Sequence, residues 1–317
     1  MFIQTGVTVF NAIFQLFLIS LLAGILVKKK FIAKPEIKVL SGITVNVFLP
    51  SMILSKILMR FKPEEITNWW ILLLAGFLII LVGILFSAIL FGFKHEKRPL
   101  MALSGMQNGL YIVLPIGQIL FPDQFDLFAI YGFILIIGLN VLMWSLGKVM
   151  ISGDKESKIH WKDFVTPPII AMFISMFLIF THLSSFVPVT VISAMDLLGQ
   201  GTIPLAVFIL GATIGTMSFK KMPPLKDVLV VTLVKFVLLP LTVFAALYYG
   251  GFQSTMPLFC SMMIIQASSP PATNLILVVE NYGGDSQAIS SMMLIQYMIC
   301  IVAMPLWIAA WQFFVVS

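Results

Sequence analysis

The chain has 317 residues, of which 60% are hydrophobic and only 10% are charged, and its mean hydropathy is +1.07. Soluble domains carry about 25% charged residues, so this composition excludes a water-soluble globular protein and indicates an integral membrane protein. The net charge of +6 does not indicate nucleic-acid binding, because the basic residues lie in short loops beside apolar segments, where they report membrane topology.

Ten apolar segments follow one another along the chain, each near the length of roughly 17–25 residues that a helix needs to cross a bilayer. They are 7–27, 36–58, 69–93, 100–121, 125–149, 164–182, 190–217, 227–249, 256–279 and 286–312. The first segment precedes all basic residues, which is the reverse of a cleavable signal peptide, so we expect it to be retained. For the seventh segment, which contains Asp196, an alternative places residues 186–196 along the membrane interface.

Basic residues predict the orientation of these segments. Most of the 19 Lys and Arg residues lie in the loops after the first, third, fifth and seventh segments. The positive-inside rule places those loops in the cytoplasm and both termini outside, as in a multi-pass protein of the cell membrane, here a bacterial cytoplasmic membrane. A linker at 151–163 separates a first five-helix repeat, 1–150, from a second, 164–317. Since five is odd, the second repeat is predicted to be inverted.

The fourth and ninth segments are interrupted by helix-breaking and polar residues. The first break is QNGLYIVLP at 107–115, and the second is QASSPPATN at 266–274. A backbone without helical hydrogen bonds is tolerated in a membrane only where protein or a watery cavity surrounds it. A matched pair of broken helices is the strongest indication of a transporter's binding site that a sequence offers. We therefore predict that the two breaks meet and cross near the middle of the bilayer.

Both breaks supply groups suited to an anion. New half-helices are expected to begin near Pro115 and Ala272, and a helix N-terminus carries unpaired N–H groups and a positive dipole end. The alternative is that proline and glycine only kink packed helices. The matched pair favours a site, and the predicted substrate-binding residues are Gln107, Asn108, Pro115, Ser268, Ser269, Pro270, Pro271, Thr273 and Asn274.

Four further residues are predicted to support the site. Asn46 and Pro50 place an amide and a kink in the second segment, and Pro204 places a kink in the seventh. Lys235 lies inside the eighth segment, where a charge is costly to insert. It could bind an anionic substrate, take part in coupling, or bind the carbonyl groups of a broken helix. The alternative is that it only extends towards the membrane surface and pairs with a carboxylate such as Glu280.

No enzyme is predicted. The three histidines are far apart and have no metal-ligand spacing, and the two cysteines, Cys260 and Cys300, lie in apolar segments as buried small side chains. The chain contains no HExxH motif, nucleophile elbow or phosphate-binding loop. Neither a metal nor a cofactor is expected.

The chain resembles the auxin efflux carrier family of permeases over essentially its whole length. The residues that carry the resemblance are NVFLP at 46–50, the NG and P of the first break, QGTIPLAVFILG at 200–211, KFVLLP at 235–240 and SSPPATN at 268–274. Families of this kind are similar in plan to the bile-acid sodium symporters. The resemblance implies an all-α membrane protein with ten transmembrane helices in two inverted five-helix repeats. It also implies a scaffold, a mobile transport part and broken, crossing helices 4 and 9 that hold the substrate.

The resemblance also implies the function. We expect a secondary transporter that moves a small organic anion, a mono- or dicarboxylate of the auxin or malate and malonate type, by alternating access. The alternatives are a sodium-coupled organic anion symporter of the bile-acid type and an anion channel. The expected partners are the anion and the lipid bilayer, a homodimer is left open, and no nucleic acid is expected.

Overall fold

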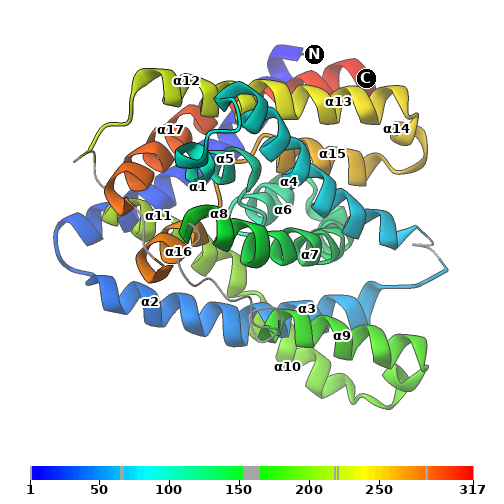
Figure 1. The fold of residues 1–317 in the computed structure, drawn as a ribbon. Helices are drawn as coiled ribbons and strands as arrows, with labels where there is room; N and C mark the ends of the chain where they lie inside the picture. Colours follow the sequence, from blue (N-terminus) through cyan, green and yellow to red (C-terminus); the bar gives the residue numbers. More distant parts are fainter. Residues whose placement is uncertain are drawn as a thin grey trace.

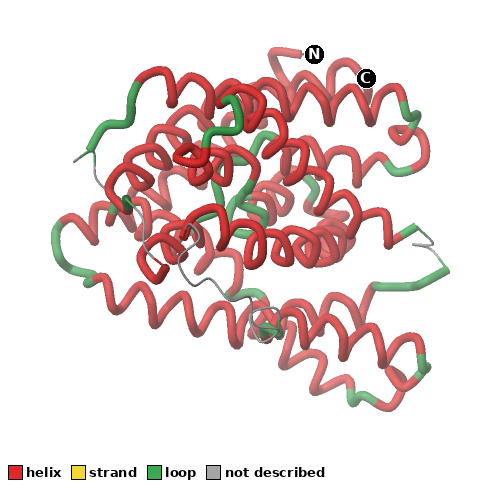
Figure 2. The backbone as a smooth tube through the Cα atoms, viewed as in Figure 1, coloured by secondary structure: helices red, strands yellow, loops and turns green. Residues whose placement is uncertain are grey.

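The computed structural model describes residues 2–64, 68–152, 165–217, 219, 221–282 and 285–316. In these ranges the chain is almost entirely helical and has no strand (Figures 1 and 2). Seven helical stretches are long and apolar enough to cross a membrane, which confirms the predicted class. They are Gly6–Lys28, Lys34–Arg60, Trp69–Phe91, Pro122–Ile151, Val189–Thr216, Leu225–Tyr249 and Ser286–Val315.

The α-helices and the π-helical turns that continue them occur in the following order along the chain. They are α1 (Phe2–Lys28), α2 (Lys34–Ile43), η1 (Thr44–Phe48), α3 (Leu49–Arg60), α4 (Trp69–Phe91), α5 (Arg98–Gly105), α6 (Val113–Leu120), α7 (Phe125–Leu142), η4 (Met143–Gly147), α8 (Lys148–Ser152), α9 (Pro167–Phe180), α10 (Val189–Gly199), α11 (Thr202–Thr216), α12 (Leu225–Leu233), η7 (Val234–Leu238), α13 (Leu239–Tyr249), α14 (Phe252–Thr255), α15 (Pro257–Ala267), α16 (Asn274–Tyr282), α17 (Ser286–Trp311) and η8 (Gln312–Val316). Short 3-10 turns lie at His95–Lys97, Pro122–Gln124 and Leu183–Phe186.

Three of the ten predicted segments do not form a single helix of spanning length. The fourth is divided into α5 and α6, and the ninth into α15 and α16, so both predicted breaks are present and the new half-helices begin close to Pro115 and Ala272. The sixth is α9, whose 14 residues extend only about 21 Å. A hydrocarbon core is about 30 Å thick, so the count of ten spans stays a prediction.

The seventh segment is one apolar helical stretch from Val189 to Thr216, with a turn at Gln200 and Gly201 between α10 and α11. Asp196 belongs to this stretch. The alternative that residues 186–196 lie along the membrane interface stays a prediction. A carboxylate inside an apolar helix needs a partner, and Asp196 has one in Lys56 of α3.

The predicted kink at Pro50 takes the form of a π-helical turn, and a second such turn precedes Pro240, where no kink is predicted. Proline has no N–H, and its ring clashes with the carbonyl four residues earlier. Before Pro50 the Leu49 N–H bonds to the Thr44 carbonyl, and before Pro240 the Leu239 N–H bonds to the Val234 carbonyl. These i→i+5 bonds widen the helix by one residue and absorb the clash. They also rotate the side chains that precede each proline.

The helices pack in two groups. In the first group, which we call the scaffold bundle, α1 packs along α11, and α3 packs against α9 and α10. In the second, which we call the crossover bundle, α4 packs against α5 and α7, and α15 packs against α13 and α17. Figure 1 shows α2, α3, α9 and α10 along one edge of the molecule and α12 and α13 along the opposite edge. The bundles meet where α1 contacts α6 and α17 and where α3 contacts α7.

Small residues bring α1 and α11 close together. A Cβ added to Gly211 of α11 would lie 2.2 Å from the Ser20 carbonyl oxygen of α1, which no real Cβ could tolerate. In a bilayer the hydrophobic effect does not drive helices together, because lipid chains are as apolar as the side chains. Close packing of the backbones is therefore a main source of helix association there. Gly211 therefore fixes the spacing within the scaffold bundle.

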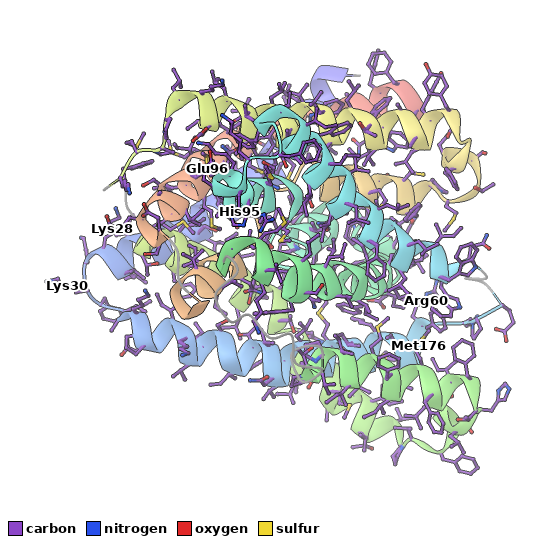
Figure 3. The ribbon with its side chains drawn as sticks, in the orientation of Figure 1. Lys28, Lys30, Arg60, His95, Glu96 and Met176 are labelled. Atoms are coloured by element: carbon purple, nitrogen blue, oxygen red, sulfur yellow. The ribbon has the colours of Figure 1, made fainter. Side chains whose placement is uncertain are left out.

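The ends of the helices lie on two sides of the molecule. Figure 3 shows Lys28 and Lys30 at one side of the molecule and Arg60 at the opposite side, with His95 and Glu96 between them and nearer to Lys28. Which of the two sides faces the cytoplasm stays a prediction.

Candidate functional site

The two breaks meet and are joined by backbone hydrogen bonds. The Asn108 N–H donates to the Pro270 carbonyl at 2.8 Å, and the Ala272 N–H donates to the Met106 carbonyl at 3.1 Å. Together they form an antiparallel bridge between Gln107 and Pro271. Buried backbone groups are almost always paired. Each broken helix therefore supplies the partners that the other one lost.

Side chains reinforce this junction. The Asn108 amide nitrogen donates to the Tyr297 hydroxyl at 2.9 Å, and that hydroxyl donates to the Pro271 carbonyl at 2.8 Å. The Asn108 amide oxygen accepts from the Tyr111 N–H at 3.0 Å, which turns the chain towards α6. Asn108 is 2% and Tyr297 7% exposed, so these bonds are shielded from water. Tyr297 of α17 thus ties the tenth predicted segment to both breaks.

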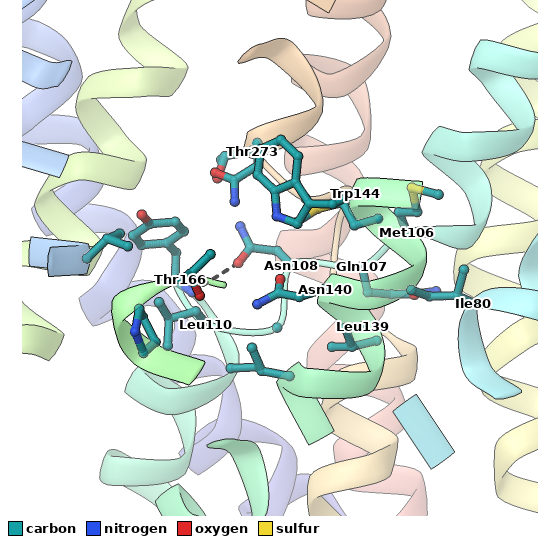
Figure 4. Close-up of a pocket in the computed structure, with 18 of the residues that line it drawn as sticks. Ile80, Met106, Gln107, Asn108, Leu110, Leu139, Asn140, Trp144, Thr166 and Thr273 are labelled. Atoms are coloured by element: carbon teal, nitrogen blue, oxygen red, sulfur yellow. Dashed lines mark hydrogen bonds between the residues drawn. The ribbon is translucent and has the colours of Figure 1, made fainter. Parts of the chain in front are cut away.

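A cavity of about 150 Å³ lies beside the junction (Figure 4). Among the described residues that line it, none is charged, and the polar ones are mainly amides and threonines. Its walls also contain apolar side chains from α4 and α7, and the indole of Trp144. The polar side chains are Gln107, Asn108, Tyr111, Asn140, Thr166, Thr273 and Asn274.

Four of the nine predicted binding residues line this cavity: Gln107, Asn108, Thr273 and Asn274. Asn274 is also the first residue of α16, so it places the start of that half-helix at the cavity. A helix N-terminus favours a negative group, although α16 has only nine residues. The cavity therefore offers amide donors and a helix dipole instead of a cationic side chain.

The other predicted binding residues lie around the junction and do not line the cavity. The Ser268 hydroxyl donates to the Ile264 carbonyl at 2.8 Å, and the Ser269 hydroxyl donates to the Gln266 carbonyl at 2.8 Å, so both end α15. Pro270 and Pro271 contribute their carbonyl oxygens to the junction.

Pro115 is buried in the first turn of α6, among residues that pack behind the junction. It starts a half-helix, as predicted, but its ring is not at the cavity wall.

The predicted supporting residues are distributed differently. Asn46 is exposed on η1, and Pro204 is exposed on α11. The residues of the second segment that line the cavity are Val45 and Leu49, on either side of Asn46 and ahead of Pro50. The structure therefore does not bring Asn46, Pro50 or Pro204 to the cavity.

Lys235 is completely buried on η7, and its ammonium nitrogen lies 3.4 Å from the Ser104 carbonyl oxygen and 3.5 Å from that of Met106. These carbonyls end α5 just before the first break. The C-terminal end of a helix is negative, so a cation there is stabilising. This geometry fits the alternative in which Lys235 holds the carbonyls of a broken helix. The side chain of Glu280, the other suggested partner, lies outside the described residues.

Two glutamines stand out because their amides have no hydrogen-bond partner within the described residues. They are Gln107, at the cavity wall, and Gln266, which is fully buried. The Gln266 amide oxygen would be 3.4 Å from a Cβ added to Gly109, another residue of the cavity wall. Leaving a buried amide unpaired costs about 1–3 kcal/mol. Both amides are therefore suited to bind a polar ligand that enters the cavity.

Several residues of the site are not predicted from the sequence. Asn140 is a single amide in an apolar segment, a pattern that by itself indicates only a hydrogen bond between helices. Trp144 and Tyr297 carry no signal that separates them from packing residues, and Thr166 lies at the edge of its segment. Their role depends on which helices become neighbours, which one sequence does not state.

An ion cluster lies at the far end of α3 from the cavity. The Lys56 ammonium is 2.9 Å from a carboxylate oxygen of Asp126 and 3.1 Å from one of Asp196, whose other oxygen accepts from Gln200 at 3.1 Å. Lys56 is seven positions after Leu49 of the cavity wall, or about 10 Å along the helix. Because Asp126 begins α7 and Asp196 belongs to α10, this cluster joins the two bundles.

A family model described as membrane transport protein matches residues 8–160 and 155–308. No curated protein matches the chain significantly in sequence.

Proposed function

Because the chain belongs to the membrane transport protein family, we propose that it is a secondary transporter that moves a small organic anion across the cell membrane by alternating access. The observation that carries this proposal is the junction of two broken helices beside a cavity whose walls combine uncharged amide groups with apolar side chains. Members of this family are transporters, and a substrate site at paired breaks is how many transporters are built. In this proposal the chain has no catalytic activity.

The substrate class follows from the groups at the cavity. Amide N–H groups and the start of α16 stabilise negative charge without a cation, as in other anion sites at helix N-termini. Ile80, Leu139 and Trp144 offer an apolar wall for the body of the substrate. A mono- or dicarboxylate with a compact apolar body fits this combination.

The proposed architecture has ten spans in two inverted repeats, 1–150 and 164–317, with the fourth and ninth spans crossing at the junction. In this arrangement the scaffold bundle stays in place and the crossover bundle moves. The basic loops would face the cytoplasm and both termini the outside. With that orientation the cavity, which Val45 and Trp144 line, would lie on the cytoplasmic side of the junction, and Lys56 would close the outer side.

Transport assays in proteoliposomes test the substrate and the site together. Labelled mono- and dicarboxylates would be supplied with pH and sodium gradients varied. We expect saturable uptake of at least one acid, which the double variant Asn108→Ala with Asn274→Ala abolishes. The matched control is Asn46→Ala, an exposed amide away from the cavity, which should retain uptake. Unchanged uptake in the double variant would overturn the site assignment.

The same assay separates the rival mechanisms. Flux that does not saturate, together with single-channel currents, would identify an anion channel. Loss of uptake when choline replaces sodium would identify a sodium-coupled symporter. Neither break contains an acidic residue, so the proposal expects uptake to persist in choline.

A substitution in the ion cluster would test alternating access. Opening the outer side would separate Asp126 from Lys56, whereas Asp196, in the same bundle as Lys56, would stay with it. A partly exposed pair is worth about 0.2–1 kcal/mol, so Asp126→Asn should raise the outward-open population by about 1.4- to fivefold. The readout is labelling of Ile53→Cys by a membrane-impermeant thiol reagent, since Ile53 is 3% exposed and lies between Leu49 and Lys56 on the same face of α3. Asp123→Asn is the control, and equal labelling in both backgrounds would contradict the gate.

A further inference from the structure

A second cavity, of about 310 Å³, lies on the other side of the junction. It is enclosed by α1, α6, α11 and α17, so it lies between the scaffold bundle and the crossover bundle. Its walls are almost entirely apolar, for example Ile13, Leu210, Leu294 and Met304. Tyr111 lines both cavities, which makes it the partition between them.

The polar atoms on these walls are already paired. The Ser20 hydroxyl donates to the Val207 carbonyl at 3.4 Å, and the Tyr297 hydroxyl donates to that of Pro271 at 2.8 Å. The Cys300 thiol donates to the Ser268 carbonyl at 3.7 Å. A buried water needs two to four polar partners. Water therefore has little to bind there, and the cavity favours an apolar occupant.

The size of the cavity also favours an occupant. An engineered apolar cavity of about 150 Å³ in another protein stays dry and binds benzene, and this one is about twice that volume. An empty apolar cavity costs stability in proportion to its volume. A flexible hydrocarbon several methylene groups long would fill the space and recover the lost contacts.

The residues at the mouth of the cavity indicate which hydrocarbon could enter it. Two of the lining residues, Phe17 of α1 and Met298 of α17, are 36% and 58% exposed. Around them α1 exposes Phe10 and Phe14, and α17 exposes Val302. Such an apolar outer surface on spanning helices faces the lipid chains of the bilayer. The cavity is continuous with that surface.

We propose that an acyl chain of a bilayer phospholipid enters between α1 and α17 and occupies this cavity. The chain would lie against Tyr111 and Tyr297, the two aromatic residues that support the junction from behind. It would therefore contribute to the packing between the two bundles and could leave when they separate. This inference does not depend on the substrate of the other cavity.

Photolabelling tests the proposal without a transport assay. The full chain would be reconstituted in nanodiscs of phosphatidylcholine that carries a diazirine near the end of one acyl chain, irradiated, digested and analysed by mass spectrometry. We expect adducts on Ile13 and Met304, which are 8% and 0% exposed and cannot be reached from outside the cavity. Adducts confined to exposed Met298 and Val302 would show that the chain stays outside, and would overturn the proposal.

Filling the cavity provides the matched comparison. Leu294→Trp adds an indole at the cavity wall, and adducts on Ile13 and Met304 should be lost. Ile295→Trp, at the neighbouring half-buried position outside the wall, should leave them unchanged. Ile214→Trp fills the same space from α11 and serves if Leu294→Trp does not fold. Adducts at full yield in the filled variants would also overturn the proposal.

Discussion

Replacing Tyr297 by phenylalanine removes a single oxygen atom from the point where the two breaks are joined. That oxygen accepts from the Asn108 amide at 2.9 Å and donates to the Pro271 carbonyl at 2.8 Å. In Tyr297→Phe both partners remain buried and lose these bonds. An unpaired buried polar group costs about 1–3 kcal/mol. Asn108 can still reach the cavity, so we expect a total loss of about 2–4 kcal/mol.

The assay is thermal unfolding of the purified protein, followed by substrate uptake at a temperature where both variants are folded. Tyr131→Phe is the matched control, because Tyr131 is 8% exposed, close to the 7% of Tyr297, and no hydrogen bond of its hydroxyl is found among the described residues. We expect a lower unfolding midpoint and slower uptake for Tyr297→Phe alone. Equal midpoints for the two variants would refute the reasoning that Tyr297 holds the breaks together.

Three further predictions concern the packing around the site. Lys235→Met removes the cation from the two carbonyls that end α5, a loss partly offset by the relief of desolvation, so its unfolding midpoint should fall more than that of Lys235→Arg, which keeps the cation. Gly211→Ala would place its methyl group 2.2 Å from the α1 backbone and should cost about 1–3 kcal/mol in thermal unfolding, whereas Gly42→Ala, with nothing within 4 Å, should be neutral or stabilising. Finally, the ion pair with Lys221 and the Ala288 N–H hold the pKa of the Asp285 carboxyl below its ordinary value of 3.8. The stabilisation by the ionised carboxylate is therefore present above that value and is lost as the pH falls through the lowered pKa. The difference in unfolding midpoint between the parent protein and Asp285→Asn should be constant near neutral pH and should disappear in acid. A difference that persists in acid would contradict this origin.

Prediction from the sequence succeeded where the signal is local. Apolar length predicts ten spans, seven of which are single helical stretches of spanning length within the described residues, and the QNG and SSPP motifs predict both helix breaks. These features depend on the hydrophobicity of consecutive residues and on the missing N–H of proline, which act over a few positions. The fully buried Lys235 was also recognised as costly, because one charge in an apolar stretch is a local anomaly.

The sequence does not give the direction of a side chain, and for some predicted site residues the structure shows a direction away from the cavity. Ser268 and Ser269 looked like ligands, yet their hydroxyls bond to the last carbonyls of α15, which local backbone geometry makes available. Asn46 looked like a neighbour of the site, yet the π-helical turn before Pro50 leaves it exposed, while Val45 and Leu49 reach the cavity. A one-residue widening of the helix changes which face a residue occupies.

The amino-acid sequence by itself determined that this is a helical membrane protein with two interrupted segments, because hydrophobic length and helix breakers act within a segment. Only the tertiary structure decided that Asn108 bonds to Tyr297, that Lys235 lies at the end of α5, and that Asn140 and Trp144 face the same cavity. Those pairings depend on which helices become neighbours. In an apolar medium that choice is made by close backbone packing and by the pairing of buried polar groups, and neither is written in the order of residues along one segment.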